Sequence, residues 1–571
     1  MAEQTGRDSI LVDLKHFYHH LLLRVGRNGV FALLLIVVLS GSAFAGWKTG
    51  FFAELYFQYN RAEIMVILED SQTGRPLVGV LVEARLDSAR QADGQVLETD
   101  EQGKVFFDRL QMGETTFRIS LPGFKDFFQT MGLNRGPNKE LVFSLQIATA
   151  EISGAAVDYV DGTPIAGAKV IAAGAEATTD KEGKFVLEEV IIGTPEVTIS
   201  KDGYYDFNQT VELVKNVAKD MGMLKLLGKG RVVFVSDRDG KNAIYWARFD
   251  GSNLKKIWEN KAGFDDTSPY LSPDKKKIIF LSNRDNQKEE YGNLKNFLYY
   301  NDTSGKSLQK ISFDAIREFY DARYGWLADG SGFVYETYSW SEEEGGGGEI
   351  KIVEVPALSA SILVKSSDLF SGDGEFGDVA LSPSSDWIAF MVAPYEETDK
   401  WGIYLIHPDG TGQKKIVSIT PWEYVDYLKF SADGKRVIYK DPASGDFYSY
   451  DIAAGTKTKI STPTPRRSYC SYVFCQIIEI YSSAQNLRAF VDYRDGKYDV
   501  YISKRDGTAE RRVTFAGGVA SVYFAGPDDR YLVYWISREQ ESAIYVIGLK
   551  EGSKPLKVSD ISSGFAGVVP E

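Results

Sequence analysis

From residue 61 onward, the chain alternates short apolar runs with short polar turns. The runs are rich in Val, Ile, Phe and Tyr, and the turns are rich in Gly, Asp and Ser. This pattern favours β-strands, because β-branched and aromatic side chains suit a pleated surface. The 54 Gly, 32 Tyr and 33 Phe residues fit many strands joined by tight turns. A chain of 571 residues exceeds a single core, so we expect a mostly β protein of several domains.

Two consecutive segments, 61–147 and 148–227, follow one plan. Each opens with an apolar strand (AEIMVILED and AEISGAAVDY) and closes with another (ELVFSLQI and MGMLKLL). Each also contains a turn of the pattern Thr-Asp-x-x-Gly-Lys, followed by an apolar strand. A repeated set of strands and turns predicts two small β-sandwiches in a row.

The repeated turn has a structural explanation. Asp100 and Asp180 can accept hydrogen bonds from the backbone N–H groups of their own turns. Gly103 and Gly183 can adopt the positive φ that closes such a turn. We therefore interpret these Asp residues as structural and not as catalytic.

The two segments resemble the carboxypeptidase regulatory-like domain, a transthyretin-like β-sandwich. The second copy carries the resemblance best, in GAAVDYVDGTPIAGAKVIAAG, TTDKEGKFVLEEV and VTISKDGYYD. The first copy is looser and contains the insertion LDSARQADGQVLE. The resemblance implies a module without catalytic activity, commonly a spacer or an adhesive unit in envelope proteins.

A different repeat, about fifty residues long, fills 228–571. Its most regular strand is apolar-Tyr, as in AIYW, FLYY, GIYL, FYSY, DVYI and AIYV, with EIKIVEV as a degenerate member. Four strands in each of seven units predict a β-propeller, and six or eight blades remain open. The first unit lacks its innermost strand, and we expect 564–571 to supply it and to latch the ring.

These units resemble TolB-like, WD-type propeller repeats. YLSPDKKKIIFLSNRD and VSDRDGKNAIYWARFDGSNLKKI carry the pattern. The resemblance implies a fold and leaves the function open, because propellers serve both enzymes and docking surfaces.

The N-terminus predicts attachment to a membrane. Residues 30–47 carry no charge, so we assign 29–47 to a transmembrane helix or signal anchor, after a cytoplasmic segment 1–28 and before a linker 48–60. More positive charge precedes the apolar segment than follows it, which places the remaining chain outside the cytoplasm, in the periplasm or at the cell surface. Alternatively, AFA at 43–45 is a signal-peptidase site, and cleavage after Ala45 yields a secreted protein.

The net charge and the few Cys and His residues limit which partners and sites the chain can have. A net charge of −14 argues against nucleic acid as a partner. Cys470 and Cys475 form either one local disulfide or a pair of free thiols. Three of the four His residues precede the membrane segment; at 16, 19 and 20 they have metal-binding spacing, but we favour an interfacial helix. His407 is interpreted as a turn residue on a blade rim.

No catalytic constellation is apparent. The chain lacks a G-x-S-x-G elbow, an H-E-x-x-H motif and a P-loop. The GDGEFG stretch at 372–377 precedes a propeller strand and does not open a helix, so it is no dinucleotide site. We therefore predict no catalytic, metal or cofactor-binding residue and no cofactor.

The sequence favours a membrane-anchored extracytoplasmic binding or scaffold protein. Its partner would be a protein or an envelope glycan, and it could be an accessory subunit of a membrane complex. Trp326, Trp340, Trp401 and Trp422 are the candidate partner-binding residues, because they fall in or near inter-strand segments. The acidic, Gly-rich stretch 341–349 is expected to be a mobile loop. The alternative is an extracytoplasmic hydrolase or lyase with an acidic or metal site at the propeller axis.

Overall fold

The computed structural model describes residues 59–570 with short gaps. The gaps are 87–93, 260–261, 289–291, 313–323, 342–344, 426, 432, 462–478, 540 and 562. The predicted segments 1–28 and 29–47, most of the linker, the N-terminal His residues, Cys470 and Cys475 lie outside the described residues. Within the part described, no helix is long and apolar enough to cross a bilayer.

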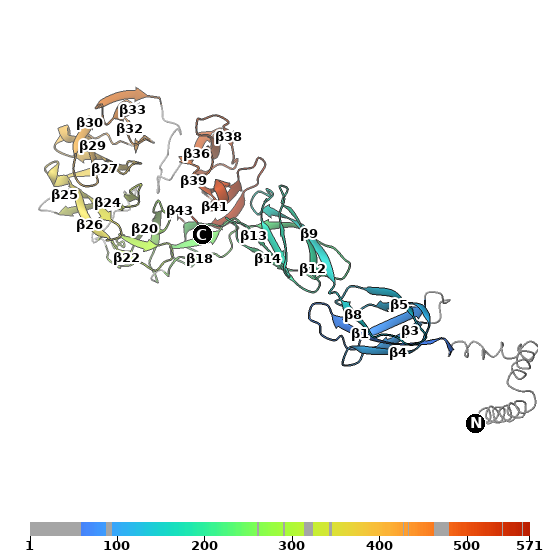
Figure 1. The fold of residues 1–571 in the computed structure, drawn as a ribbon. Helices are drawn as coiled ribbons and strands as arrows, with labels where there is room; N and C mark the ends of the chain where they lie inside the picture. Colours follow the sequence, from blue (N-terminus) through green and yellow to red (C-terminus); the bar gives the residue numbers. More distant parts are fainter. Residues whose placement is uncertain are drawn as a thin grey trace, which may run out of the picture.

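Three β-structures follow one another in a row, two small sandwiches and then a larger ring of sheets (Figure 1). Strands dominate the described chain. Its helical segments are single 3-10 turns at Ser366–Asp368, Thr398–Lys400 and Pro527–Asp529. The mostly β fold expected from the sequence is confirmed.

The first sandwich has two sheets. One contains β1 (Arg61–Asp70), which pairs with β4 (Lys104–Gln111) on one side and with β7 (Gly136–Pro137) and β8 (Leu141–Leu145) on the other. The second has the order β3-β2-β5-β6, with bounds Gly94–Glu98, Leu81–Leu86, Gly113–Ile119 and Phe127–Leu133. Alternate residues of β1 are buried, so this strand supplies one face of the core.

The second sandwich repeats this strand order. One sheet has the order β12-β9-β15, with bounds Lys184–Ile191, Thr149–Asp158 and Lys219–Leu226. The other has the order β11-β10-β13-β14, with bounds Ala175–Thr178, Lys169–Ala172, Glu196–Ser200 and Phe207–Thr210. In each sandwich the first and last long strands pair in parallel, β1 with β8 and β9 with β15.

The repeated turns are built as the sequence predicts. The carboxylate of Asp100 accepts a hydrogen bond from the N–H of Lys104 at 2.8 Å, and Asp180 accepts one from Lys184 at 2.7 Å. The following Gly has a φ of 72° in the first turn and 75° in the second. A side chain there would also meet the backbone: a Cβ on Gly183 would lie 2.4 Å from the carbonyl oxygen of Ala156.

Seven four-stranded antiparallel sheets occupy the described part of 231–569, which is the arrangement of a β-propeller (Figure 1). The first contains β16 (Arg231–Ser236), β17 (Ala243–Arg248), β18 (Lys255–Lys256) and β43 (Ser563–Val569). The second contains β19 (Asp266–Leu271), β20 (Lys277–Ser282), β21 (Phe297–Asp302) and β22 (Gln309–Lys310). The third contains β23 (Tyr324–Trp326), β24 (Gly332–Ser341), β25 (Gly345–Glu354) and β26 (Ser359–Lys365).

The remaining four sheets continue in chain order. The fourth contains β27 (Gly374–Leu381), β28 (Ile388–Pro394), β29 (Gly402–Ile406) and β30 (Lys414–Ser418). The fifth contains β31 (Leu428–Phe430), β32 (Arg436–Lys440), β33 (Phe447–Asp451) and β34 (Thr456–Ile460). The sixth contains β35 (Glu479–Tyr481), β36 (Leu487–Arg494), β37 (Lys497–Lys504) and β38 (Arg511–Arg512). The seventh contains β39 (Val519–Ala525), β40 (Tyr531–Arg538), β41 (Glu541–Gly548) and β42 (Leu556–Asp560).

The recurring Tyr of the third strand has a common role. In six sheets it stacks on an aromatic residue directly opposite on the second strand, with ring centroids 5.7–6.2 Å apart. These pairs are Phe234–Tyr245, Phe280–Tyr299, Phe390–Tyr404, Tyr439–Tyr448, Phe490–Tyr501 and Tyr534–Tyr545. In the third sheet, Lys351 stands opposite Tyr335, which explains the degenerate repeat. Cross-strand pairs of this kind stabilise a sheet.

The predicted closure of the ring is confirmed. The C-terminal strand β43 pairs antiparallel with β16 and completes the first propeller sheet. Phe565 of β43 lies in the same buried cluster as Phe234 and Tyr531. The two ends of the propeller sequence therefore share one sheet, which removes an exposed edge.

The prediction for the acidic Gly-rich stretch 341–349 was wrong for most of it. Residues 345–349 belong to β25 and pair with Thr337–Ser341 of β24, so the hairpin continues through the glycines. Only 342–344 lie between the two strands, and they are outside the described residues. Backbone N–H and C=O groups form the ladder whatever the side chain, so the Gly and Glu composition did not prevent pairing.

Buried apolar clusters join most neighbouring propeller sheets. Within the described ranges they connect the first sheet to the second, the second to the third, the third to the fourth, the fourth to the fifth, the sixth to the seventh, and the seventh to the first. No such cluster of described residues spans the fifth and sixth sheets. The fifth is also the least buried of these sheets on its second strand, where only Val437 and Tyr439 are buried.

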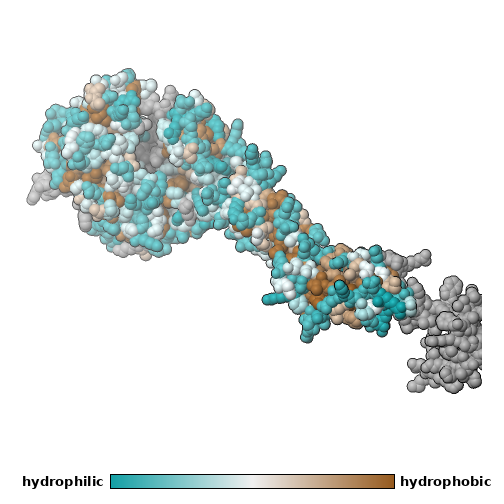
Figure 2. All heavy atoms as spheres, in the orientation of Figure 1, coloured by the Kyte–Doolittle hydropathy of each residue, from teal (hydrophilic) through white to brown (hydrophobic). Residues whose placement is uncertain are grey.

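The surface is unevenly apolar. Figure 2 shows brown side chains gathered on the two sandwiches, whereas the visible propeller face is mostly teal and white. Phe106, Phe128 and Val142 of the first sandwich and Val186 and Met223 of the second are exposed. They lie on both sheets of the first sandwich and on two strands of one sheet of the second, so the exposed apolar residues are spread over the sandwich surface.

Candidate functional site

The four predicted Trp residues occupy different environments. Trp326 is buried, and its indole N–H donates to the carbonyl of Tyr270 at 3.1 Å, so it belongs to the propeller core. The side chain of Trp340 lies outside the described residues, although its backbone is part of β24. Trp401 is fully buried, whereas Trp422 is 61% exposed.

Three connections meet at one end of the fourth propeller sheet. They are the segment before β27, the segment 395–401 between β28 and β29, and the segment 419–425 between β30 and β31. The N–H of Tyr395 donates to the carbonyl of Asp373 at 2.8 Å, which joins the first two. The N–H of Ile419, in the third connection, donates to the carbonyl of Trp401, which joins the third connection to the second.

These connections carry an aromatic patch made of Tyr395, Trp401, Trp422 and Tyr424. The rings of Tyr395 and Trp422 are nearly parallel, 17° apart, with centroids 5.8 Å apart. The buried ring of Trp401 lies beneath, 5.7 Å from Trp422 and 5.3 Å from Tyr424. Its indole N–H donates to the carbonyl of Pro394, which fixes the ring. The patch is therefore a supported layer of rings whose outer members face solvent.

The backbone of Trp422 is unusual. Its φ is 68°, in the left-handed region that residues other than Gly and Asn rarely adopt. Holding a bulky residue there costs about 1 kcal/mol, and exposing most of the ring recovers little burial energy. Trp422 has the largest side chain among the fourteen described non-Gly residues with positive φ.

Carboxylates lie on or next to the same connections as the patch, and we call Glu375, Glu396 and Glu397 the acidic rim. Glu375 accepts a hydrogen bond from the hydroxyl of Tyr424 at 2.7 Å. The other two belong to the connection between β28 and β29. The N–H of Ser371 donates to the carboxylate of Glu397 at 2.5 Å and lowers the pKa of this group, so Glu397 is ionised at neutral pH.

Sequence reasoning missed Tyr395 and Tyr424 as members of the patch. Its candidates were all Trp, and only Trp401 and Trp422 come together. The signal was present in the stretches PYEETDKW and PWEY, where aromatic and acidic residues alternate in two inter-strand segments. Recognising it required knowing that both segments reach the same end of one sheet.

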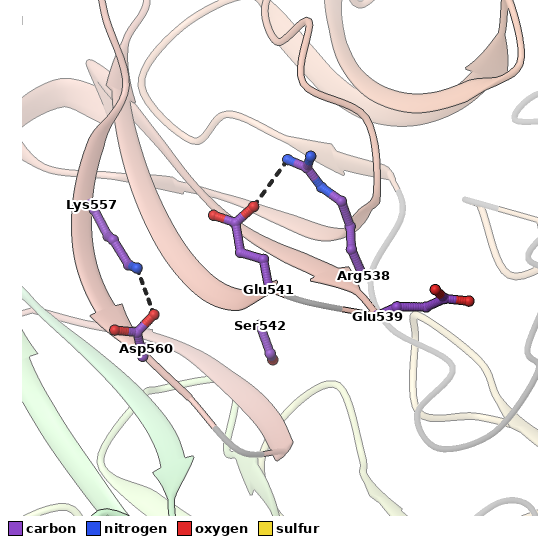
Figure 3. Close-up of a pocket in the computed structure, with 6 residues that line it drawn as sticks. All are labelled: Arg538, Glu539, Glu541, Ser542, Lys557 and Asp560. Atoms are coloured by element: carbon purple, nitrogen blue, oxygen red, sulfur yellow. Dashed lines mark ion pairs between the residues drawn. The ribbon is translucent and has the colours of Figure 1, made fainter.

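A second surface feature is a concavity of about 860 Å³ beside the seventh propeller sheet (Figure 3). It is lined by Arg538, Glu539, Glu541, Ser542, Lys557 and Asp560. Arg538 pairs with Glu541 at 3.2 Å, and Lys557 pairs with Asp560 at 2.6 Å. Four of the five charged residues are paired with one another, and Glu539 leaves a single excess negative charge, so the concavity offers no strong field of either sign.

The innermost propeller strands bring Tyr270 of β19 and Tyr523 of β39 near one another. Desolvation by the surrounding residues raises the pKa of both phenols, although Tyr270 is 42% exposed, so they stay neutral in the physiological range. Tyr523 also packs against Phe565, with centroids 4.9 Å apart. In the part of the chain that the structure describes, no three His, Cys, Asp or Glu residues gather as a metal site.

His407 is held as a turn residue. Its ring lies on Trp387 with centroids 3.6 Å apart. Its Nδ1 is 2.7 Å from the carbonyl oxygen of Asp386, so this nitrogen is the donor. The contacts fix the imidazole to the neighbouring turn.

Comparison with known proteins identifies part of the chain. The model of the carboxypeptidase regulatory-like domain family matches residues 151–223, which lie within the second sandwich. No curated protein sequence matches the chain.

Comparison with solved structures finds weak similarity to proteins of varied activity. TolB from Acinetobacter baumannii is 12% identical, with 66% of this chain and 79% of that chain covered and a TM-score of 0.31. A periplasmic gluconolactonase from Pseudomonas aeruginosa is 15% identical, with 60% and 98% covered and a TM-score of 0.39. An oligogalacturonate lyase from Vibrio parahaemolyticus is 14% identical, with 57% and 88% covered and a TM-score of 0.36. At these values the similarities carry no argument about activity, and the fold assignment depends on the sheet order above.

Proposed function

We propose that this chain is a membrane-anchored, extracytoplasmic binding or scaffold protein that presents a propeller to a partner protein. Residues 29–47 anchor it, and the two sandwiches act as a spacer. The shared strand order supports extending the sandwich family from the second sandwich to the first. The seven sheets act as seven blades of one ring, closed by β43.

The observation that supports binding most directly is the aromatic patch. Exposed Trp and Tyr side chains dominate the energy of many protein interfaces, because they bury a large area with few rotatable bonds. Here Trp422 is held in a strained backbone conformation and remains 61% exposed. Backbone strain of this kind is typical of functional sites.

The experiment compares partners of the detergent-solubilised full chain with those of Trp422→Ala. Affinity purification followed by mass spectrometry should recover at least one protein with the unaltered chain that Trp422→Ala loses. The matched control is Phe515→Ala, which removes another exposed aromatic side chain of the propeller, 68% exposed. If Trp422→Ala and the unaltered chain recover the same proteins in equal amounts, the patch is not the docking surface.

The hydrolase or lyase alternative stays a prediction. It would place chemistry at the axis, near Tyr270 and Tyr523, and not on the patch. Substitution of both by Phe would abolish an axial activity while leaving the recovery of partners through Trp422 unchanged.

A further inference from the structure

We propose that the aromatic patch and the acidic rim recognise a cationic segment of the partner protein, with an Arg or Lys side chain seated on the ring of Trp422. This inference depends on the proposed function, because it names the chemistry of the partner at the same surface. It goes further by requiring positive charge on the partner.

The first argument is the charge around the patch. Segments 371–378, 395–401 and 419–425 carry seven Asp or Glu residues and one Lys, and Lys415 of β30 adds a second cation that donates to the carbonyl of Asp399 at 2.6 Å. This excess of negative charge matches the net charge of −14 and attracts a cationic partner over a neutral or acidic one. The N–H of Ser371 donates to the carboxylate of Glu397, so the fold fixes the position of this charge.

The second argument is the orientation of the rings. Trp401 supports Trp422 from below, and Tyr395 stacks nearly parallel to it. A cation above the face of a Trp is attracted by its quadrupole, more strongly than above Tyr or Phe. Carboxylates beside such a ring can pair with the same guanidinium or ammonium group, which adds a directional contact.

The third argument comes from the rest of the propeller. In four of its six stacked aromatic pairs, an Arg or Lys of the chain lies over the rings. Lys457, for example, lies 3.9 Å from the ring centroid of Tyr448, and Arg284 lies 4.9 Å from that of Tyr299. Among the residues that the structure describes, no Arg or Lys lies over the ring of Trp422. An Arg or Lys side chain of a partner would give this ring the contact that four of the six pairs receive from the chain itself.

The test uses the full chain in detergent and two synthetic peptides of nine residues. One carries three Arg residues separated by Gly, and the other carries citrulline, a neutral analogue of similar shape, at the same positions. Titration calorimetry should show about tenfold tighter binding of the Arg peptide, which is the scale of a partly desolvated cation–π contact. A higher salt concentration should weaken binding of the Arg peptide and leave binding of the citrulline peptide unchanged.

Variants locate the binding. Trp422→Asn keeps a residue that tolerates positive φ, so the chain should fold with an unchanged or higher melting temperature while the Arg peptide loses about tenfold in affinity. Glu396→Gln should cost about threefold and reduce the salt dependence. Phe515→Ala should bind like the unaltered chain, because that ring already has Arg512 above it, 5.0 Å from its centroid.

Each other outcome overturns the inference. Equal binding of the two peptides, or no loss with Trp422→Asn, excludes recognition of a cation by this ring. If the neutral glycan cellohexaose binds in place of the Arg peptide and Trp422→Asn abolishes it, the surface binds glycans: the cationic partner is wrong and the proposed docking surface stands. If Trp422→Asn changes neither ligand binding nor the recovery of partner proteins, both proposals fail.

Discussion

The joint between the second sandwich and the propeller is built from buried polar contacts, whereas the joint between the two sandwiches lies near the surface. At the first, Asp158 is fully buried and accepts hydrogen bonds from the hydroxyls of Tyr204, at 2.9 Å, and Tyr531. Arg530 donates to the hydroxyl of Tyr204 at 2.9 Å. Val160 of the sandwich belongs to the same buried cluster as Tyr531 of the propeller.

At the joint between the sandwiches, Lys215 pairs with Asp126 at 2.8 Å, and both side chains are partly exposed. The buried apolar clusters of the two sandwiches do not share a described residue. Backbone hydrogen bonds such as Ala148 N–H to the carbonyl of Gly123, 2.8 Å, hold the connection locally.

The difference indicates where the molecule bends. A hydrogen bond to a buried charged group contributes about 1.5–3 kcal/mol, whereas an exposed ion pair contributes little. We therefore expect the second sandwich and the propeller to move as one body. Bending should concentrate between the sandwiches, which would let the first sandwich reorient while the proposed docking surface keeps its geometry relative to the second sandwich.

The largest effect should come from deleting 560–571. This removes β43 from the first propeller sheet, exposes β16, and takes Phe565 out of the cluster that Val160 also joins. We expect a loss on the order of 5 kcal/mol and a lower melting temperature by differential scanning calorimetry. Removing Pro570 and Glu571 alone, beyond the strand, is the control. An unchanged melting temperature after the full deletion would contradict the latch.

Next in size is Asp158→Ala. It leaves the hydroxyls of Tyr204 and Tyr531 buried without their acceptor, which should destabilise the joint by about 3 kcal/mol. Urea denaturation should show this loss, and small-angle scattering should show a broader range of orientations between sandwich and propeller. Asp161→Ala, at the neighbouring turn position, is the comparison. Two indistinguishable variants would argue that the network does not hold the joint.

Raising the pH above 10 should weaken the joint between the second sandwich and the propeller. Burial raises the pKa of Tyr204 and Tyr531 above the ordinary value near 10. The negative charge of Asp158 raises it further, because it disfavours a phenolate beside it. The stabilisation is therefore complete below pH 10 and is lost as the pH rises above 10, by about 1.4 kcal/mol per pH unit for each phenol. Fluorescence energy transfer across the joint would follow it. Tyr531→Phe should reduce the dependence of the energy-transfer signal on pH, and Tyr159→Phe should not. The reverse result would show that these phenols are not the cause of the pH dependence.

The smallest effect should follow Lys215→Ala at the other joint. Its partner is exposed, so the melting temperature should not change measurably. Small-angle scattering should show only a slightly wider distribution of angles between the sandwiches. A destabilisation as large as that of Asp158→Ala would remove the contrast between the two joints.

The repeats in the sequence determined much of the fold. The paired turns at Asp100 and Asp180 were predicted with their hydrogen bonds and their left-handed glycines. The recurring Tyr located the third strand of nearly every propeller sheet, and the closing role of the C-terminus followed from a missing strand. These features are local, because a turn and a strand are set by neighbouring residues and by the alternation of buried faces.

Composition misled where backbone pairing decided the outcome. The glycines of 345–349 looked like a loop, but the ladder with β24 extends through them. Trp326 looked like a surface candidate beside a turn, but the packing of neighbouring sheets buries it.

Only the tertiary structure decided the joint and the patch. Asp158 reads as an ordinary turn residue, yet its hydroxyl partner Tyr531 is 373 residues away. Tyr395 and Trp422 belong to different connections, and they stack only because both reach the same end of one sheet. The periodicity of a sequence reports which face of a strand is buried. The contact between the second sandwich and the propeller, and the meeting of separate connections at one end of a sheet, bring together residues that periodicity does not relate. That is why the strands could be predicted from the sequence, whereas the polar joint at Asp158 and the aromatic patch around Trp422 could not.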